Sequence, residues 1–205
     1  VADSANPVGL ALDIRAGATA VTDPGNHMLQ ATPTACPLES ARVNLLQYTE
    51  DFGNAVWQTV ATTASANTAT APDGTTTADT LSEGVSNDRH ITYVDNLAVT
   101  SGLTYTLSVY AKYVDRQYAV LGLDAGPISR VYFDLVNGTV TSEVSCTGAI
   151  SSAGNGWYRL SLTATAVSGG SYPQFAMSDR SAPGGSMAFD TPVYAGTGKT
   201  VQIWG

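Results

Sequence analysis

Charged side chains are scarce in this chain, and most of those present are acidic. They make up 13% of 205 residues, with 17 Asp and Glu against 9 Lys and Arg, so the net charge at pH 7 is −8. Such a chain repels a phosphate backbone, because nucleic-acid binding depends on clustered Lys and Arg. Disorder combines dense charge with few apolar residues, whereas 43% of this chain is hydrophobic. We therefore expect a folded protein that does not bind nucleic acid.

Cysteine and histidine are almost absent, which restricts the chemistry that the chain can perform. Cys36 and Cys146 lie too far apart for a metal or redox motif, and they are either two free thiols or a long-range disulfide. The two histidines, His27 and His90, are not accompanied by a G-x-S-x-G nucleophile motif. No phosphate-binding loop, dinucleotide fingerprint or H-E-x-x-H motif is present either.

Catalysis by acidic residues is the remaining enzymatic interpretation. A glycosidase places two carboxyl groups on either side of its cleft, and Asp124, Asp134 and Asp179 are available for such a pair. Nothing in their spacing brings two of them together. We therefore expect a protein that is not an enzyme.

Long apolar runs are also missing. Without a run of about 18 apolar residues, we expect no insertion into a membrane. The chain begins at Val1 without a basic and apolar leader, and it ends in the strand-like residues 201–205. We expect it to be a processed product or a part of a longer chain.

Threonine, serine and glycine are abundant, with 26 Thr, 18 Ser and 20 Gly. From Asn44 onward, β-favouring residues alternate with polar ones and turn signals separate the segments. The clear strands are expected at residues 105–113, 117–124, 130–135, 157–163 and 173–178, and weaker ones at 56–63, 76–81, 89–94, 140–145, 148–152 and 200–204. No run of ten residues has a helical period. The pattern predicts an all-β fold, an antiparallel jelly-roll β-sandwich.

The first 43 residues differ in composition from the rest. Four prolines with glycines between them make this segment rich in turns, and only residues 8–13 are strand-like. We expect residues 1–43 to form an irregular N-terminal arm or linker and residues 44–205 to form the sandwich. The Thr- and Ala-rich stretch 62–80 is expected to join two strands.

Alternation within the clear strands predicts which side chains face the core. The expected inward residues are Leu107, Val109, Ala111, Ala119, Leu121, Leu123, Val131, Phe133, Leu135, Tyr158, Leu160, Leu162, Phe175 and Met177. Asn137 and Gly138 predict a tight hairpin turn in which both central residues have positive φ.

The opposite face of these strands carries aromatic and polar side chains, because residues i and i+2 share a face. A sugar ring stacks its apolar C–H face on an aromatic ring, and its hydroxyl groups need hydrogen-bond partners. We therefore predict a glycan-binding face whose candidate residues are Tyr110, Tyr118, Arg130, Tyr132, Asp134, Arg159 and Gln174. The alternatives are a protein contact in an assembly and an ordinary solvent-exposed surface.

Calcium is the one cofactor that the composition would suit, although none is required. Hard cations take oxygen ligands from carboxylates and backbone carbonyls without a long sequence motif. Glu50, Asp51 and Asp190 lie near expected strand ends and are the candidate ligands of a structural calcium ion. The alternative is that they are solvated loop carboxylates.

Several stretches from Asn44 onward resemble one family. Residues 44–57 resemble the opening pattern N-L-L-x-x-S/T-E-D-F-x-N-x-x-W of carbohydrate-binding-module-like jelly-roll domains in bacteriophage and prophage structural proteins. Later patterns of that family are resembled, in order, by residues 71–79 (A-P-D-G-T-x-T-A-D), 104–112 (Y-T-F/L-S-V-Y-A-K), 132–140 (F-D-L-x-x-G-T-V), 154–159 (G-N-G-W-Y-R) and 203–205 (L/I-W-G).

The first 43 residues resemble the segment that often precedes this module in phage tail proteins. Residues 7–13 are similar to P-V-G-L-x-L-D, and residues 25–38 to G-N-H-x-x-Q-A-T-x-x-x-R-P-x-L. Cys36 stands where that pattern has Arg, so any role of the Arg is lost here. The family usually continues past the terminal W-G with a further polar stretch, which this sequence lacks.

The resemblance implies a non-catalytic module of a virion fibre, spike or tail, assembled in the host cytoplasm and then carried on the particle. Its expected partners are host-surface polysaccharide or glycans, other virion proteins, and further copies of itself in a trimer. Three tryptophans belong to the family pattern, Trp57, Trp157 and Trp204, and we expect them to pack rather than to bind sugar. The alternative function is a purely structural virion subunit that mediates oligomerisation or attachment.

Overall fold

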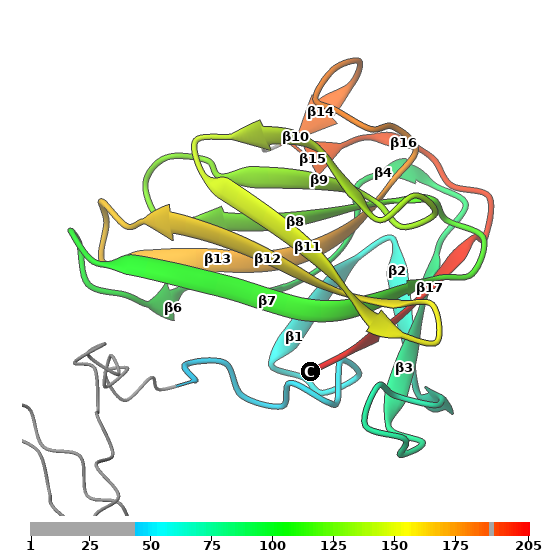
Figure 1. Ribbon diagram of the computed structural model, residues 1–205. Coiled ribbons are helices and arrows are strands. Elements are labelled where there is room, and N and C mark those ends of the chain that lie inside the picture. Colours follow the sequence, from blue (N-terminus) through cyan, green and yellow to red (C-terminus); the bar gives the residue numbers. More distant parts are fainter. Residues whose placement is uncertain (1–43, 189–190) are drawn as a thin grey trace, which may run out of the picture. The chain divides into compact units, whose positions relative to one another are not determined.

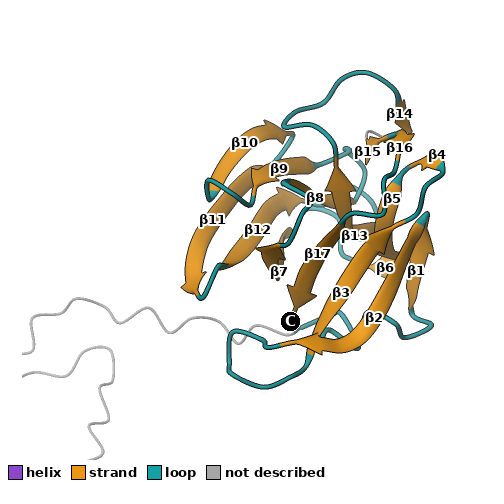
Figure 2. Ribbon diagram, turned by 90° about the vertical axis from the view of Figure 1, so that its right-hand side faces the viewer, coloured by secondary structure: helices purple, strands orange, loops and turns teal. Residues whose placement is uncertain are grey.

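Strands make up the regular secondary structure of the described part of the chain, as Figure 2 shows by colour. The structure is a computed structural model that describes residues 44–188 and 191–205. No helix forms within these two ranges. The expected arm of residues 1–43, with its strand-like stretch, lies outside the described residues, as does Asp190.

Seventeen strands form in the described residues. In chain order they are β1 (Trp57–Val60), β2 (Thr62–Ala69), β3 (Ala78–Glu83), β4 (Asn87–Asp88), β5 (His90–Val94), β6 (Leu97–Ala98), β7 (Thr104–Tyr113), β8 (Tyr118–Asp124), β9 (Arg130–Asp134), β10 (Thr139–Val144), β11 (Thr147–Gly154), β12 (Trp157–Thr165), β13 (Gly170–Ser178), β14 (Met187–Ala188), β15 (Thr191–Pro192), β16 (Tyr194–Ala195) and β17 (Thr200–Trp204). All the pairings between them are antiparallel.

The longer strands form two sheets that pack as a sandwich (Figure 1). Sheet I has the strand order β1-β5-β13-β8-β9-β10, with β6 paired to β13, and sheet II has the order β11-β12-β7-β17-β3-β2. The chain crosses between the sheets from β10 to β11 and again from β12 to β13, as in a jelly roll. The prediction of an all-β antiparallel sandwich is confirmed.

The main core lies between the two sheets. Each of the fourteen side chains expected to point inward belongs to this core or packs against it. From sheet I, Leu121 and Phe133 are buried, and Leu160 of sheet II is fully buried against them. The period-two assignment of the clear strands is therefore confirmed.

The stretch expected to be a connection is not one. Residues 62–69 form β2 and residues 78–83 form β3, and these two strands pair in sheet II. A break at Ala61, whose φ is +46°, separates β2 from β1. Because a left-handed residue redirects the backbone, the expected strand at 56–63 is divided between the two sheets.

The hairpin between β9 and β10 forms at the expected place with a different turn. Of its two expected left-handed residues, only Gly138 has positive φ, at 65°. The side chain of Asp134 accepts hydrogen bonds from the amides of Val136 at 2.9 Å and Asn137 at 3.0 Å. The amide of Gly138 donates to the carbonyl of Asp134 at 2.9 Å. These bonds hold a longer turn in which Asn137 keeps ordinary φ.

A buried ion pair ties the C-terminal strands to the sandwich. Glu83, whose side chain is fully buried, accepts hydrogen bonds from Arg116 Nε at 3.0 Å and the Tyr194 hydroxyl at 2.8 Å. The amide of Thr197 also donates to Glu83 Oε1 at 2.8 Å. Burial alone would raise the pKa of Glu83, but Arg116 and these donors lower it to about 2 from 4.5.

The depressed pKa of Glu83 predicts a stability that falls in acid. Glu83 contributes fully above pH 4.5, and its contribution is lost as the pH falls toward 2, because the unfolded chain takes up the proton first. We expect Glu83→Gln to lower the free energy of unfolding at pH 7 by about 3 kcal/mol. The difference between wild type and variant, measured by urea unfolding, should shrink from pH 4.5 downward. A difference that is independent of pH would contradict this account.

Candidate functional site

The seven predicted face residues lie on two different sheets. Tyr110 of β7 and Arg159 of β12 are paired neighbours on the side of sheet II that faces away from the core. The other five belong to β8, β9 and β13 of sheet I. The prediction of one shared face is therefore wrong. Alternation determines which residues of one strand share a face, but it does not determine which strands share a sheet.

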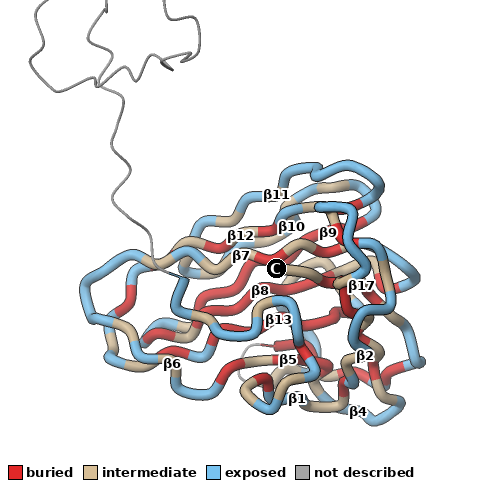
Figure 3. Tube along the Cα trace, turned by 90° about the horizontal axis from the view of Figure 1, so that it is seen from below, coloured by how far each residue is buried: buried red, intermediate tan, exposed pale blue. Residues whose placement is uncertain are grey.

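The five residues on sheet I do share its outer face, meaning the face turned away from sheet II. Much of that face is buried, as the colours along β8 and β13 in Figure 3 illustrate. Tyr132 is 0% exposed within a second apolar cluster that includes Ile91 and Val120. The prediction that Tyr132 lies on an open surface is wrong, and a buried ring cannot stack on a sugar.

Asp134 and Tyr118 lie at one end of this outer face. The carboxylate of Asp134 holds the β9–β10 turn and accepts a hydrogen bond from Gln117 Nε2 at 2.9 Å. Burial opposes its ionisation, but donors from Asn137 and Gln117 hold the pKa of Asp134 below its usual value. Asp134 therefore has a structural role, while Tyr118 is half-buried beside it.

The open part of the outer face is a hollow of about 360 Å³ at the other end of the strands. One side is formed by alternate residues along β5 and its flanks, Arg89, Ile91, Tyr93 and Asp95. Because successive side chains of a strand point to opposite faces, these four point the same way. Asp95 is exposed, and Tyr93 and Arg89 are partly exposed. This side offers an aromatic ring and both signs of charge.

The other side of the hollow is formed by Asp124, Tyr172 and Gln174. Tyr172 is 43% exposed, and Gln174 is buried at the base. Gln174 is the one predicted face residue that lines the hollow. The side chain of Thr191 donates to Gln174 Oε1 at 3.4 Å, and this bond links the base to β15.

A second buried ion pair fixes the carboxylate at the base. Arg130, which is 1% exposed, donates to both oxygens of Asp124, from Nη2 to Oδ2 at 2.9 Å and from Nη1 to Oδ1. Gln174 Nε2 donates to Asp124 Oδ2 at 3.3 Å. The bidentate geometry restricts the rotation of the carboxylate. Arg130 thus supports the hollow from beneath and does not line it.

Gly122 makes room for this arrangement. It pairs with Gln174 on one side and with Arg130 on the other. A Cβ at position 122 would lie 2.7 Å from Gln174 Cγ and 2.8 Å from Arg130 Nη1. Both side chains therefore cross the strand where only a glycine leaves space.

Six residues that line the hollow were not among the predicted face residues: Arg89, Ile91, Tyr93, Asp95, Asp124 and Tyr172. The signal for three of them was available, since 89–94 is an expected strand whose alternation places Arg89, Ile91 and Tyr93 on one face. Nothing in the sequence pairs that strand with β13, which brings these residues beside Tyr172. The role of Gly122 depends equally on strand pairing.

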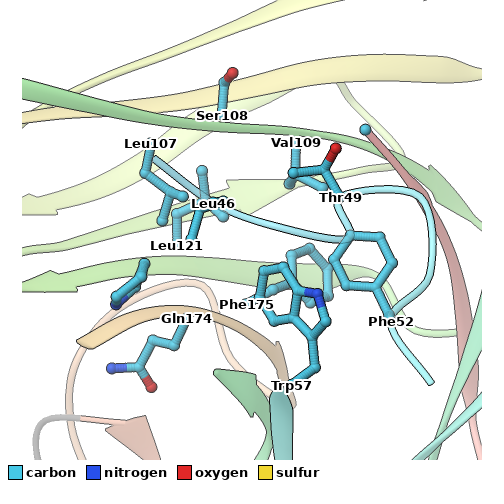
Figure 4. A pocket seen from close by; sticks show the side chains of 12 residues that line it. Leu46, Thr49, Phe52, Trp57, Leu107, Ser108, Val109, Leu121, Gln174 and Phe175 are labelled. Atoms are coloured by element: carbon cyan, nitrogen blue, oxygen red, sulfur yellow. The ribbon is translucent and has the colours of Figure 1, made fainter. Parts of the chain in front are cut away.

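A smaller pocket lies at the edge of the core and does not form a binding site. The side chains of Phe52, Trp57 and Phe175 gather there with those of nearby aliphatic residues (Figure 4). Its volume is about 20 Å³, which is room for about one water molecule. The ring centroids of Phe52 and Trp57 are 4.8 Å apart, so this pocket is a packing gap.

The three tryptophans pack within the described domain. The indole N–H of Trp57 donates to the carbonyl of Tyr48, and that of Trp157 to the carbonyl of Thr70. Trp57 is 8% and Trp157 1% exposed. The half-buried Trp204 lies against Tyr110, with ring centroids 5.4 Å apart. The expectation that these rings pack is confirmed.

Of the three predicted calcium ligands, the structure describes Glu50 and Asp51. Glu50 and Asp51 are exposed on the loop before β1, where Asp51 Oδ2 contacts Asn54 Nδ2 at 3.5 Å, and Asp190 lies outside the described residues. Among the described residues, no group of three His, Cys, Asp or Glu is placed to hold a metal ion. A structural calcium ion remains a prediction.

The remaining chemically interesting side chains are engaged by the backbone or by salt bridges. The ring nitrogens of His90 lie 2.8 Å from the carbonyl of Ala61 and 3.1 Å from that of Tyr194. Asp179 pairs with Arg180. Cys146 is a free thiol whose pKa is raised by burial, and its partner in any disulfide would be the undescribed Cys36.

Comparison with known proteins adds no relative. No protein-family model matches the chain, and no curated protein matches it significantly. In the described ranges, no helix is long and apolar enough to cross a lipid bilayer. The fold and the hollow are therefore the basis of a functional proposal, together with the motif resemblance.

The close contacts of Gly122 predict that a methyl group there is costly. We expect Gly122→Ala to lower the free energy of unfolding by about 1–3 kcal/mol, because Gln174 or Arg130 must move. Gly169→Ala is the matched control, since its Cβ would meet only a carbonyl oxygen at 3.9 Å. Urea unfolding should show the control within about 0.5 kcal/mol of the wild type. Equal effects of the two substitutions would refute the role of Gly122.

Proposed function

We propose that the chain is a non-catalytic glycan-binding module of a bacteriophage virion protein, and that the hollow on sheet I is its binding site. The observation that carries this proposal is the lining of the hollow. Two partly exposed tyrosines lie beside carboxylates, a guanidinium and an amide. Sites for small polar ligands combine such apolar surfaces with a few convergent polar groups.

The chemistry of the lining suits a sugar. The ring of Tyr172 offers a flat apolar surface to the C–H face of a pyranose. Asp124 and Gln174 at the base offer an acceptor and a donor to hydroxyl groups. Because Arg130 fixes Asp124, little side-chain order has to be gained on binding, and preorganisation of this kind favours affinity.

The virion assignment rests on the motif resemblance. Under this proposal the module is assembled in the host cytoplasm and carried on a tail fibre, spike or decoration of the particle. Other virion proteins and two further copies of the chain, in a trimer, are its partners there, and the host-surface polysaccharide is its ligand. The competing function is a structural subunit that binds no sugar.

Removing the exposed tyrosine tests the binding site. We expect Tyr172→Ala to weaken binding at least tenfold, which corresponds to about 1.4 kcal/mol, because the ring no longer stacks on the sugar. The matched control is Tyr113→Ala, since Tyr113 is 42% exposed at the end of a sheet II strand. A glycan array of bacterial polysaccharides identifies the ligand, and calorimetry measures the affinities.

The outcomes separate the two functions. If the wild type binds a sugar on the array, and Tyr172→Ala but not Tyr113→Ala binds it more weakly, the hollow is supported as the binding site. An equal loss of affinity in both variants would contradict the hollow as the binding site. If no polysaccharide on the array is retained, the glycan-binding function is wrong and the structural subunit is favoured.

A further inference from the structure

We propose that the hollow selects neutral saccharides and rejects those that carry uronic acids, with Asp124 as the residue that determines this specificity. This inference rests on the proposed glycan-binding function and adds the chemical class of the ligand. It follows from the hydrogen-bonding capacity of Asp124 and from the charges around the hollow.

The lone pairs of Asp124 require a hydrogen-bond donor on the ligand. An ionised carboxylate only accepts hydrogen bonds, at about four positions. Three are occupied by the two Arg130 donors and Gln174 Nε2. The side chain of Asp124 is still 20% exposed, so one acceptor position remains for a donor in the hollow. A sugar hydroxyl can donate there, whereas a uronate carboxylate cannot.

The positive charge nearest to Asp124 is committed to it. Arg130 is 1% exposed, and its guanidinium spans both oxygens of Asp124. It is therefore screened from the hollow by the carboxylate that it holds. A ligand carboxylate would approach Asp124 and not Arg130, and like charges in a partly desolvated site repel strongly.

Among the described residues, the charges at the hollow are balanced. Asp95 and Asp124 contribute two negative charges, and Arg89 and Arg130 two positive ones. The whole chain adds a net charge of −8, which raises the free energy of any anionic polymer near the surface. A neutral ligand is not repelled by this field, whereas a uronate has to give up hydration and approach a net negative surface beside Asp124.

The test compares sugars that differ only in the acid group. The full chain is titrated with glucan and glucuronan, galactan and galacturonan, and mannan and mannuronan oligomers of equal length. We expect the neutral member of any pair that binds to bind at least tenfold more tightly than its uronic partner at about 10 mM salt. The difference between the neutral and uronic affinities should be smaller at about 1 M salt. The Debye length falls there from about 30 to about 3 Å, and the repulsion of the uronate is screened.

Two variants test the role of Asp124. In Asp124→Asn, an amide replaces the acceptor-only carboxylate, and we expect the ratio between neutral and uronic affinities to fall toward one. Because this substitution also breaks a buried ion pair, its fold is checked by urea unfolding. Asp95→Asn removes an exposed charge from the same hollow and leaves that ion pair intact. It should lower the ratio between neutral and uronic affinities by a smaller factor than Asp124→Asn does.

The outcomes distinguish this inference from the function on which it rests. Uronic oligomers that bind as tightly as their neutral partners would overturn the selectivity and leave glycan binding intact. If neither variant changes the ratio between neutral and uronic affinities, Asp124 and Asp95 do not cause the selectivity. If neither these oligomers nor any polysaccharide on the array binds, the glycan-binding function itself fails.

Discussion

The ion pair between Arg130 and Asp124 is the interaction on which the outer face of sheet I depends. Three neighbouring strands of this sheet are buried on both faces over much of their length, so an unpaired charge there would be costly. Arg130 pairs with Asp124, and Gly122 leaves the space through which the guanidinium and the Gln174 side chain pass. The same bonds aim the carboxylate into the hollow, which connects the requirement of the fold to the geometry of the site.

A comparable constraint operates at Glu83, where Arg116, Tyr194 and the amide of Thr197 compensate a fully buried carboxylate. The two pairs differ in what they organise. Glu83 connects segments that are distant in sequence, and it therefore stabilises the sandwich. Asp124 keeps part of its surface in contact with solvent and so remains available to a ligand. Burial decides between the two roles, because both pairs join an arginine to a carboxylate.

Alternation was sufficient to predict the fold class and the core-facing residues, since the inward positions of β7, β8, β9, β12 and β13 depend only on local sequence. It could not assign strands to sheets, and Tyr110 and Arg159 were therefore grouped with residues of the opposite sheet. The burial of Tyr132 had a sequence signal in its neighbours Val131 and Phe133, because a continuous apolar run indicates a strand covered on both faces. The hollow itself depends on β5 pairing with β13, a contact between residues about 80 positions apart that no local pattern specifies.

The most direct measurement of the central claim is an amide NMR titration of the chain with a glycan that it retains. Binding in the hollow predicts that the amide signals of residues 89–95, 122–124, 172 and 174 shift, while those around Tyr110 and Arg159 on sheet II do not. Shifts confined to Tyr110, Arg159 and their neighbours would move the site to the other sheet and contradict the account given for Asp124.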